Sequence, residues 1–491
     1  MGFKVDASFL RFLTMGALGV RRVADELAER GFEPIELERY GRSNKIWSTK
    51  VKRLRLPDLL CVRTGLRVEV RAKSDLRIRM SDAPNNPERV WDAGMRDEDL
   101  VALIACIGGP NGPEPAAGGV YFSVRALRDS VNLSKLGPPK SASEGAERDR
   151  TWPSTVPSRP GYVLSVTPHK LVVRMEGDGK PARRQTYTLG AKRAYVAAGD
   201  RFAAQVTMLA GAPASLADID RYLVNRYDPL AAIASEEAVD RYAAVKALRY
   251  RDDLRTAAVP ALESALDTAQ EVRVALEAAG SAAALGSHVG EERLVTLLWD
   301  QSSGIEMSME AILILTELRT PFARDQLLQV ASDPLFHHDE RRQAAIWGLG
   351  KAGLRSYEDL VPFIGDEEED VAFHAIAAFG SETPTPTIDR LVTLLLDGDP
   401  RTAPAASEAL RVIGSPAVLE ALYTALLAVG RRTDWVLVTL ARLSPELVRE
   451  RLRGTPLLQR LEPLLLIAPG ANWLTTEEAT TNMTFLLKQE L

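Results

Sequence analysis

The phrase EVRVALEAAGSAAALG, residues 271–286, recurs along the second half of this chain. It returns as DERRQAAIWGLGKAG at 339–353, DVAFHAIAAFGS at 370–381 and RTAPAASEALRVIG at 401–414. The equivalent positions Arg273, Arg342, Ala372 and Ala403 are 69, 30 and 31 residues apart, and EMSMEAILILTELRT at 306–320 fills the double gap. A period of about 30 to 35 residues is typical of stacked helix pairs.

The segments between these phrases also have apolar residues at helical spacing, as in ERLVTLLWD at 292–300 and IDRLVTLLLDGD at 388–399. One helix pair cannot bury its apolar face alone, so we expect six or seven pairs to stack into an all-α solenoid over residues 231–491. The phrases resemble HEAT repeats of the short bacterial type, in which VR..AA.AL...G marks the first helix. The resemblance implies a scaffold with a long surface for a nucleic acid, a protein partner or a second copy of the chain.

The first half of the chain has a different pattern. Residues 1–135 alternate a long helical segment at 8–30, which should end at Gly31, with β-type runs such as DLLCV, LRVEVRA and VALIACIGG. This order indicates an α/β or α+β domain. Residues 136–160 are rich in Pro, Ser, Gly and charge and read as a linker, and short alternating runs predict a small β-barrel-like domain at 161–230.

Composition indicates a soluble globular protein, with 46% hydrophobic and 26% charged residues. Arg11 interrupts the apolar run at 9–20, which excludes a signal peptide or a membrane span there, so we expect a cytoplasmic protein without a membrane partner. Cys61 and Cys106 lie in apolar runs and read as buried, reduced thiols. Five scattered histidines predict no zinc site. His337 and His338 are interpreted as surface residues at a helix start.

Charge is unevenly distributed along the chain. The net charge is -5, yet residues 1–80 contain 18 Lys and Arg against 10 Asp and Glu. A basic segment of this kind can bind a polyanion, and it favours a nucleic-acid partner, DNA rather than RNA. A solvated surface that only keeps the protein soluble explains the same charge.

The basic segment contains LPDLLCVRTGLRVEVRAKS, residues 56–74. Its second half alternates strictly, so one strand face carries small apolar residues and the other carries Arg67, Glu69, Arg71 and Lys73. The two halves predict a β-hairpin. A loop of Arg63 and Thr64 sets Asp58 opposite Glu69, whereas a loop that includes Gly65 sets Asp58 opposite Val70 unless a bulge restores the alignment. A solvated edge strand is the simpler interpretation of one charged face.

If Asp58 and Glu69 converge, their carboxylates suit Mg²⁺ or Mn²⁺, and Lys73 could position an attacking water. The residues resemble the PD-(D/E)XK family of restriction and repair endonucleases, with Pro57-Asp58 as the PD and Glu69 as the second acid. The resemblance implies a restriction-endonuclease-like fold and four catalytic residues, Asp58, Glu69, Lys73 and Arg71, of which Asp58 and Glu69 would hold the metal. The chain departs from the motif because Arg71 stands where the family has lysine, and Arg71 cannot act as a base.

Two functions are consistent with these features. The first is a metal-dependent endonuclease that hydrolyses phosphodiester bonds, with a HEAT-repeat scaffold, similar in organisation to modular proteins of bacterial antiviral defence or DNA processing. The second is a non-enzymatic HEAT-repeat adaptor with a degenerate, nuclease-like nucleic-acid-binding domain, which the arginine at position 71 favours.

Overall fold

The computed structural model describes residues 7–37, 47, 49, 54–109, 112–140, 146–177, 181–269, 271–300, 302, 304–351, 353–427 and 434–467. Its contacts divide the chain into two compact units. The N-terminal unit comprises Arg11–Arg42 and Arg53–Leu285, and the helical unit comprises Met1–Leu10, Ser43–Lys52 and Gly286–Glu490. The helical unit thus combines two short segments from the start of the chain with its C-terminal part.

The N-terminal unit contains a mixed sheet. Its strand order is β1 (Pro34–Glu36), β2 (Leu59–Cys61), β3 (Arg67–Lys73), β5 (Leu100–Gly109) and β6 (Gly112–Pro115), and β7 (Val120–Ser123) also pairs with β5. Strands β1, β2 and β3 are antiparallel in turn, whereas β3 and β5 are parallel. Strand β3 is therefore a central strand, and the interpretation of its charged face as a solvated edge strand is wrong.

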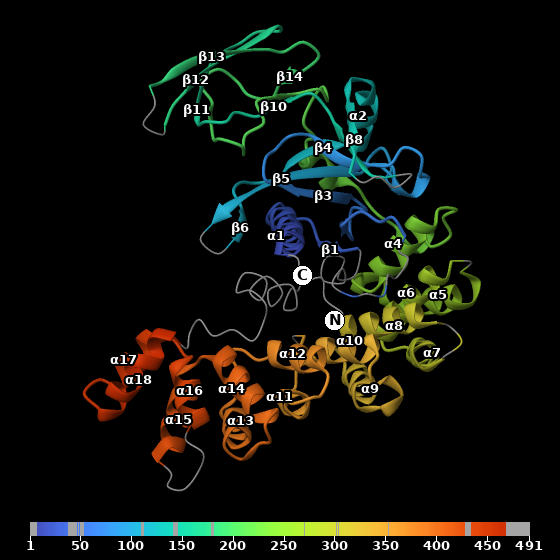
Figure 1. Ribbon diagram of the computed structural model, residues 1–491. Helices are drawn as coiled ribbons and strands as arrows, with labels where there is room; N and C mark the ends of the chain where they lie inside the picture. Colours follow the sequence, from blue (N-terminus) through green and yellow to red (C-terminus); the bar gives the residue numbers. More distant parts are fainter. Residues whose placement is uncertain are drawn as a thin grey trace. The chain divides into compact units, whose positions relative to one another are not determined.

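Helix α1 (Ala7–Glu29) covers one face of this sheet (Figure 1). Its Val20, Val23 and Leu27 are buried against Val68 and Val70 of β3 in one apolar core. A methyl group on Gly19 would lie 2.6 Å from Cβ of Ala72, so the glycine is needed for the close approach of helix and strand. The helix ends as predicted, at Gly31 with a positive φ of 93°.

The opposite face of the sheet packs against a second layer. Val101 and Leu103 of β5 share a core with Trp91 and Trp152, whose rings meet edge to face at 5.1 Å. Trp152 follows β9 (Arg148–Thr151), which pairs with β4 (Arg79–Asp82) and β8 (Lys135–Pro139). The described part of residues 136–160 is therefore not the linker that the sequence predicted but contains strands β8, β9 and β10 (Ser154–Thr155). The polar composition of these strands gave no sign that Trp152 beside them is buried in this core.

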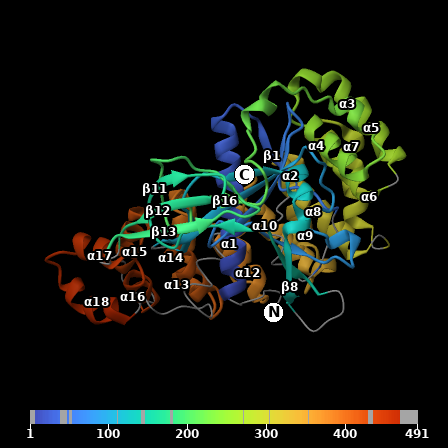
Figure 2. The same cartoon turned by 90° about the horizontal axis from the view of Figure 1, so that it is seen from above.

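The predicted β-type runs of the central region form two small antiparallel sheets. One has the order β13 (Arg183–Thr188), β12 (Lys170–Met175), β11 (Gly161–Val166) and β15 (Arg201–Phe202), and Figure 2 shows β11, β12 and β13 side by side. The other consists of β10 (Ser154–Thr155), β16 (Ala210–Gly211) and β14 (Arg193–Ala194). Helix α2 (Val124–Asp129) follows β7 within the N-terminal unit. Among the described residues, the helical array begins after position 228.

The C-terminal array contains sixteen helices within the described residues. Four belong to the N-terminal unit: α3 (Pro229–Ala232), α4 (Ala238–Leu248), α5 (Arg255–Thr268) and α6 (Val272–Ala284). The helical unit contains α7 (His288–Trp299), α8 (Ile305–Leu318), α9 (Pro321–Ser332), α10 (Glu340–Leu349), α11 (Tyr357–Leu360), α12 (Glu369–Ala377), α13 (Thr385–Asp397), α14 (Thr402–Ile413), α15 (Pro416–Leu427), α16 (Asp434–Ala441), α17 (Pro445–Arg451) and α18 (Pro456–Ile467). The repeated phrases fall on α6, α8, α10, α12 and α14, which confirms the predicted helical repeats.

The helical unit has a continuous layer of even-numbered helices. Helices α8, α10, α12, α14, α16 and α18 each contact the next even-numbered helix, while α9 and α13 pack against the layer as the second helices of their pairs (Figure 1). The strands of the N-terminal unit and the helical-repeat array agree with the coarse part of the predicted fold class. The restriction-endonuclease-like fold expected for residues 1–135 is not shown.

Among the described residues, every helix is too short or too polar to cross a membrane.

Candidate functional site

The hairpin of β2 and β3 brings two predicted site residues to opposing positions. Leu59 pairs with Val68 and Leu60 with Arg67, so opposed residues sum to 127 and Asp58 falls opposite Glu69. The connecting turn is longer than the two-residue loop considered from the sequence, and Gly65 adopts a positive φ of 70° within it. The amide of Cys61 still donates to the carbonyl of Leu66 at 2.8 Å, which preserves the alignment.

Both carboxylates are engaged by the protein. An Asp58 oxygen accepts a hydrogen bond from the backbone amide of Val70 at 2.8 Å. The Glu69 carboxylate forms an ion pair with Arg71 at 2.9 Å, with side chains that are 12% and 29% exposed. Arg71 therefore neutralises the Glu69 carboxylate, which a metal ion would need as a ligand. The PD-(D/E)XK nucleases have a lysine at this position instead.

Lys73 lies farther along β3, in a different charge environment. Burial, together with the nearby charges of Arg71 and Arg79, lowers the pKa of its amine to about 8, although the charge of Asp149 opposes this shift. Arg79 is on β4 and Asp149 on β9, so Lys73 faces the three-stranded sheet. The structure thus brings Asp58, Glu69 and Arg71 together and directs Lys73 to other partners.

Arg67, the first residue of the charged face, is buried. Its guanidinium donates to Asp99 at 2.6 Å and to Asp240 at 2.7 Å. Asp99 is fully buried and also accepts from the backbone amide of Arg96 at 2.7 Å. Asp240 lies in the first turn of α4, so this network joins the sheet to the first long helix of the array. A cavity of about 210 Å³, lined in part by Arg67, Arg96 and Tyr227, lies beside it.

Much of the basic charge of the described part of residues 1–80 is satisfied within the fold. Arg30 pairs with Asp220 at 3.0 Å, and Arg63 pairs with Glu33 at 2.8 Å. Together with the ion pairs of Arg67 and Arg71, these contacts reduce the charge that remains for a polyanion. The excess of Lys and Arg counted in the sequence is therefore a poor measure of a nucleic-acid surface.

A second candidate site is an apolar groove in the helical unit. It has a volume of about 480 Å³ and lies between α12 and α14, two neighbours in the even-numbered layer. Phe373 and Ile376 of α12 and Val412 of α14 line it, and all three side chains are half-buried. These apolar atoms remain in contact with water because neither helix covers the other there.

Charged residues surround the groove. Four carboxylates and two guanidinium groups line it: Asp366, Glu367, Glu369, Glu408, Arg401 and Arg411. Although burial opposes the shift, Arg342 holds the pKa of Asp366 below its usual value, and Arg411 does the same for Glu408. Both acids are therefore ionised near neutral pH, and the arginines with which they pair balance their charge. The exposed Glu367 and Glu369 supply the negative charge of the rim next to α12.

Comparison with known proteins does not assign this chain to a family. No family model matches the chain, and no curated protein matches it. Among solved structures, the complex of CpcE and CpcF of phycocyanin lyase from Nostoc sp. PCC7120 is 20% identical, with a TM-score of 0.23, over 49% of this chain and 94% of that one. Human deoxyhypusine hydroxylase is 19% identical, with a TM-score of 0.17, over 48% of this chain and 83% of that one.

These comparisons correct the assignment made from the sequence. No nuclease family model matches the chain, and neither of the two similar structures is named as a nuclease, so the resemblance to PD-(D/E)XK nucleases and the predicted endonuclease function are wrong. The motif was misleading because Pro57, Asp58 and Glu69 match it by residue type alone. In the structure, Glu69 is the second acid of the motif, and it is already paired with the cationic side chain of Arg71.

Binding of Mg²⁺ or Mn²⁺ at Asp58 and Glu69 stays a prediction. We expect the ion pair of Arg71 with Glu69 to weaken the affinity for the metal ion. Replacing Arg71 with alanine should raise the affinity for Mn²⁺ about fivefold, since breaking a partly exposed ion pair costs about 1 kcal/mol. Asp58→Asn in the Arg71→Ala background should cancel the gain. Isothermal titration of the three proteins checks this, and equal affinities in all of them would show that the two acids do not form a cation site.

Proposed function

We propose that this protein is a non-enzymatic adaptor whose HEAT-like helical unit binds a protein partner in the groove between α12 and α14. The observation that supports the proposal is the groove itself: an open apolar channel between consecutive repeats, floored by Phe373, Ile376 and Val412. Helical repeats commonly use such surfaces to hold partners. In this proposal Asp58, Glu69, Arg71 and Lys73 have no catalytic step.

The groove chemistry specifies the partner. Two parallel helix walls with an apolar floor fit an amphipathic helix that inserts side chains at i, i+3 or i+4 and i+7. The four carboxylates around the floor, against two guanidinium groups, favour Lys and Arg beside those apolar side chains. We therefore infer a basic amphipathic helical segment as the occupant.

A nucleic acid fits this groove less well. Its phosphates would meet the exposed carboxylates of Glu367 and Glu369, and the apolar floor offers no neutralising charge. The basic side chains at the rim, Arg401 and Arg411, are outnumbered, and Arg411 already pairs with Glu408 at 2.6 Å. A protein segment is thus the better match.

Peptide binding to the full chain tests the proposal. The probes are a labelled 18-residue amphipathic helix of Leu and Lys and a matched helix of Leu and Glu, measured by fluorescence anisotropy. We expect the basic peptide to bind more tightly. Phe373→Asp should weaken its binding about 30-fold, because truncating a central apolar contact and adding a charge costs about 2 kcal/mol or more.

The matched control is Val289→Asp on α7, where an exposed valine of the same unit is replaced. This variant should bind as the unmodified protein does, and circular dichroism should show that both variants fold. Equal binding of both peptides, or binding that survives Phe373→Asp, would refute the groove. Duplex DNA and single-stranded RNA probes complete the set, and tight binding of either without peptide binding would contradict the adaptor.

A further inference from the structure

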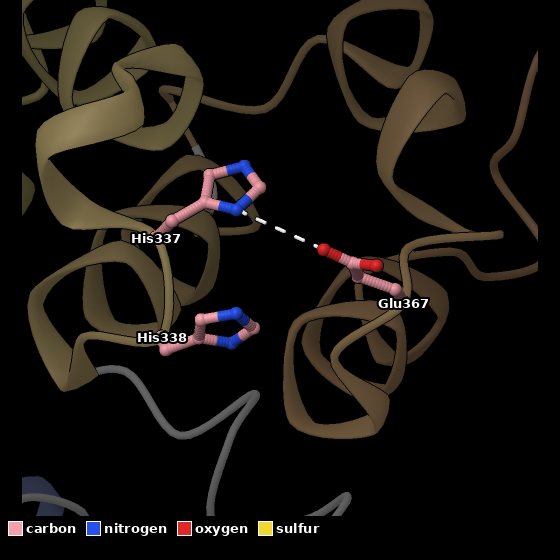
Figure 3. A group of neighbouring side chains, drawn as sticks. All are labelled: His337, His338 and Glu367. Carbon is pink, nitrogen blue, oxygen red and sulfur yellow. Dashed lines mark ion pairs between the residues drawn. The ribbon is translucent and has the colours of Figure 1, made fainter.

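Two loops of consecutive repeats bring three metal-ligating side chains together. His337 and His338 precede α10, and Glu367 precedes α12 (Figure 3). One ligand atom from each residue lies within 4.8 Å of the other two. His337 Nδ1 is 3.8 Å from Glu367 Oε1, the ion pair drawn in Figure 3. Two imidazoles and one carboxylate converge although the histidines and the acid are about 30 positions apart in the sequence.

The loops are held to each other by buried contacts. Arg342 of α10, which is 5% exposed, pairs with Asp366 at 2.5 Å and with Glu368 at 3.0 Å. These two acids flank Glu367, so the backbone that carries Glu367 is anchored on both sides. The backbone amide of His338 donates to Glu368 at 2.9 Å, which holds His338 in a left-handed conformation with a φ of 58°. The cluster is therefore fixed by its backbone rather than by chance contact of exposed side chains.

Glu368 lies beside the imidazole of His338. Its Oε1 is 3.6 Å from His338 Nδ1, just beyond hydrogen-bond range, and its side chain is only 10% exposed. A carboxylate close to metal-binding imidazoles is common in protein metal sites. The Nδ1 atom of His337 faces Glu367.

We propose that His337, His338 and Glu367 bind one Zn²⁺ ion between the repeats of α10 and α12. Zinc accepts this combination of nitrogen and oxygen ligands, and three protein ligands leave a fourth position open. The ligand side chains are 47%, 73% and 52% exposed, so the open position faces solvent. The site shares Glu367 with the rim of the groove between α12 and α14. The proposal differs from the sequence-based expectation of no zinc site.

Titration of the metal-free full chain with Zn²⁺ tests the site. We expect one Zn²⁺ per chain by calorimetry, and Co²⁺ in its place should give the visible absorption of a site with nitrogen ligands. His337→Ala, His338→Ala and Glu367→Gln should each weaken Zn²⁺ binding at least about tenfold, since even outer contacts of metal ligands change affinity by that factor. All three side chains are exposed, so the variants should fold, as circular dichroism would verify.

The matched control is His288→Ala. His288 Nδ1 lies 3.1 Å from Glu291 and forms a two-ligand pair on α7. Its removal should leave Zn²⁺ binding unchanged. Zn²⁺ that fails to bind at micromolar concentration would overturn the site. Binding that persists in His337→Ala combined with Glu367→Gln would also overturn it, because the ion would then lie elsewhere.

Discussion

Replacing Trp47 with alanine should lower the free energy of unfolding of the helical unit by about 3 to 5 kcal/mol, the usual cost of removing a large buried aromatic side chain. Trp47 is 1% exposed and belongs to the helical unit although it comes early in the chain. Its ring lies 6.0 Å from the ring of Trp347 on α10 and 5.2 Å from that of His374 on α12. The side chain therefore fills space between two repeats.

Chemical denaturation followed by circular dichroism measures this effect on the helical transition. Trp47→Phe should cost much less, since it keeps an aromatic ring in the same space. Leu427→Ala, at a position that is 65% exposed, serves as a neutral control with a change below about 0.5 kcal/mol. An unchanged transition in Trp47→Ala would show that the segment around Trp47 does not stabilise the array.

The pH dependence of the same transition reports on His374. Burial and, to a smaller extent, the charge of Lys351 lower the pKa of its imidazole from 6.5 to about 3, so the folded state holds His374 neutral. Between these two pH values the unfolded chain binds a proton that the folded chain does not, so stability falls as the pH drops below 6.5. We expect a loss of about 1 kcal/mol per pH unit from this residue. His374→Leu should remove that part of the slope.

The second large effect is expected at Asp99. Asp99→Ala should destabilise the N-terminal unit by about 3 to 5 kcal/mol, because it leaves the buried guanidinium of Arg67 without its main partner. Arg67 is 1% exposed and donates to Asp99 through two nitrogen atoms, so the variant leaves both of these donors without the carboxylate. The remaining contact with Asp240, at 2.7 Å, compensates only in part.

A double-mutant cycle with Arg67→Met separates the ion pair from simple loss of volume. The double variant should be more stable than Asp99→Ala alone, since removing both charges avoids a buried, unpaired one. Thermal unfolding of the four proteins provides the measurement. If the two single changes simply add, the contact between Arg67 and Asp99 carries no special stability and the prediction is wrong.

The sequence alone predicts much of the array, because each repeat carries its own helical periodicity and its neighbours are adjacent in the chain. The register of the hairpin is also accessible, since Asp58 and Glu69 are separated by one short turn. The proposed zinc ligands left a signal in the repeat spacing. His337 and Glu367 are 30 residues apart, the distance between Arg342 and Ala372, so they occupy the same position in successive repeats.

Other contacts have no local signal in the sequence. Arg67 looked like part of a solvated face because its partner Asp240 is 173 residues away. The strands within residues 136–160 are short and polar, and only their pairing with other strands, such as that of β9 with β4, identifies them. The nuclease assignment failed for a related reason: a motif specifies residue types, whereas the ion pair of Glu69 with Arg71 is a property of the folded side chains.

The location of Trp47 also affects the order in which the protein folds during synthesis. Its binding place is made by Trp347 and His374, and the latter is translated 327 residues later. At about 5 to 20 residues per second, the ribosome needs roughly 15 to 65 s to make that stretch. The N-terminal unit is complete at Leu285, well before α12 emerges. The segment that carries Trp47 must therefore wait, with its indole in water, until translation is nearly finished.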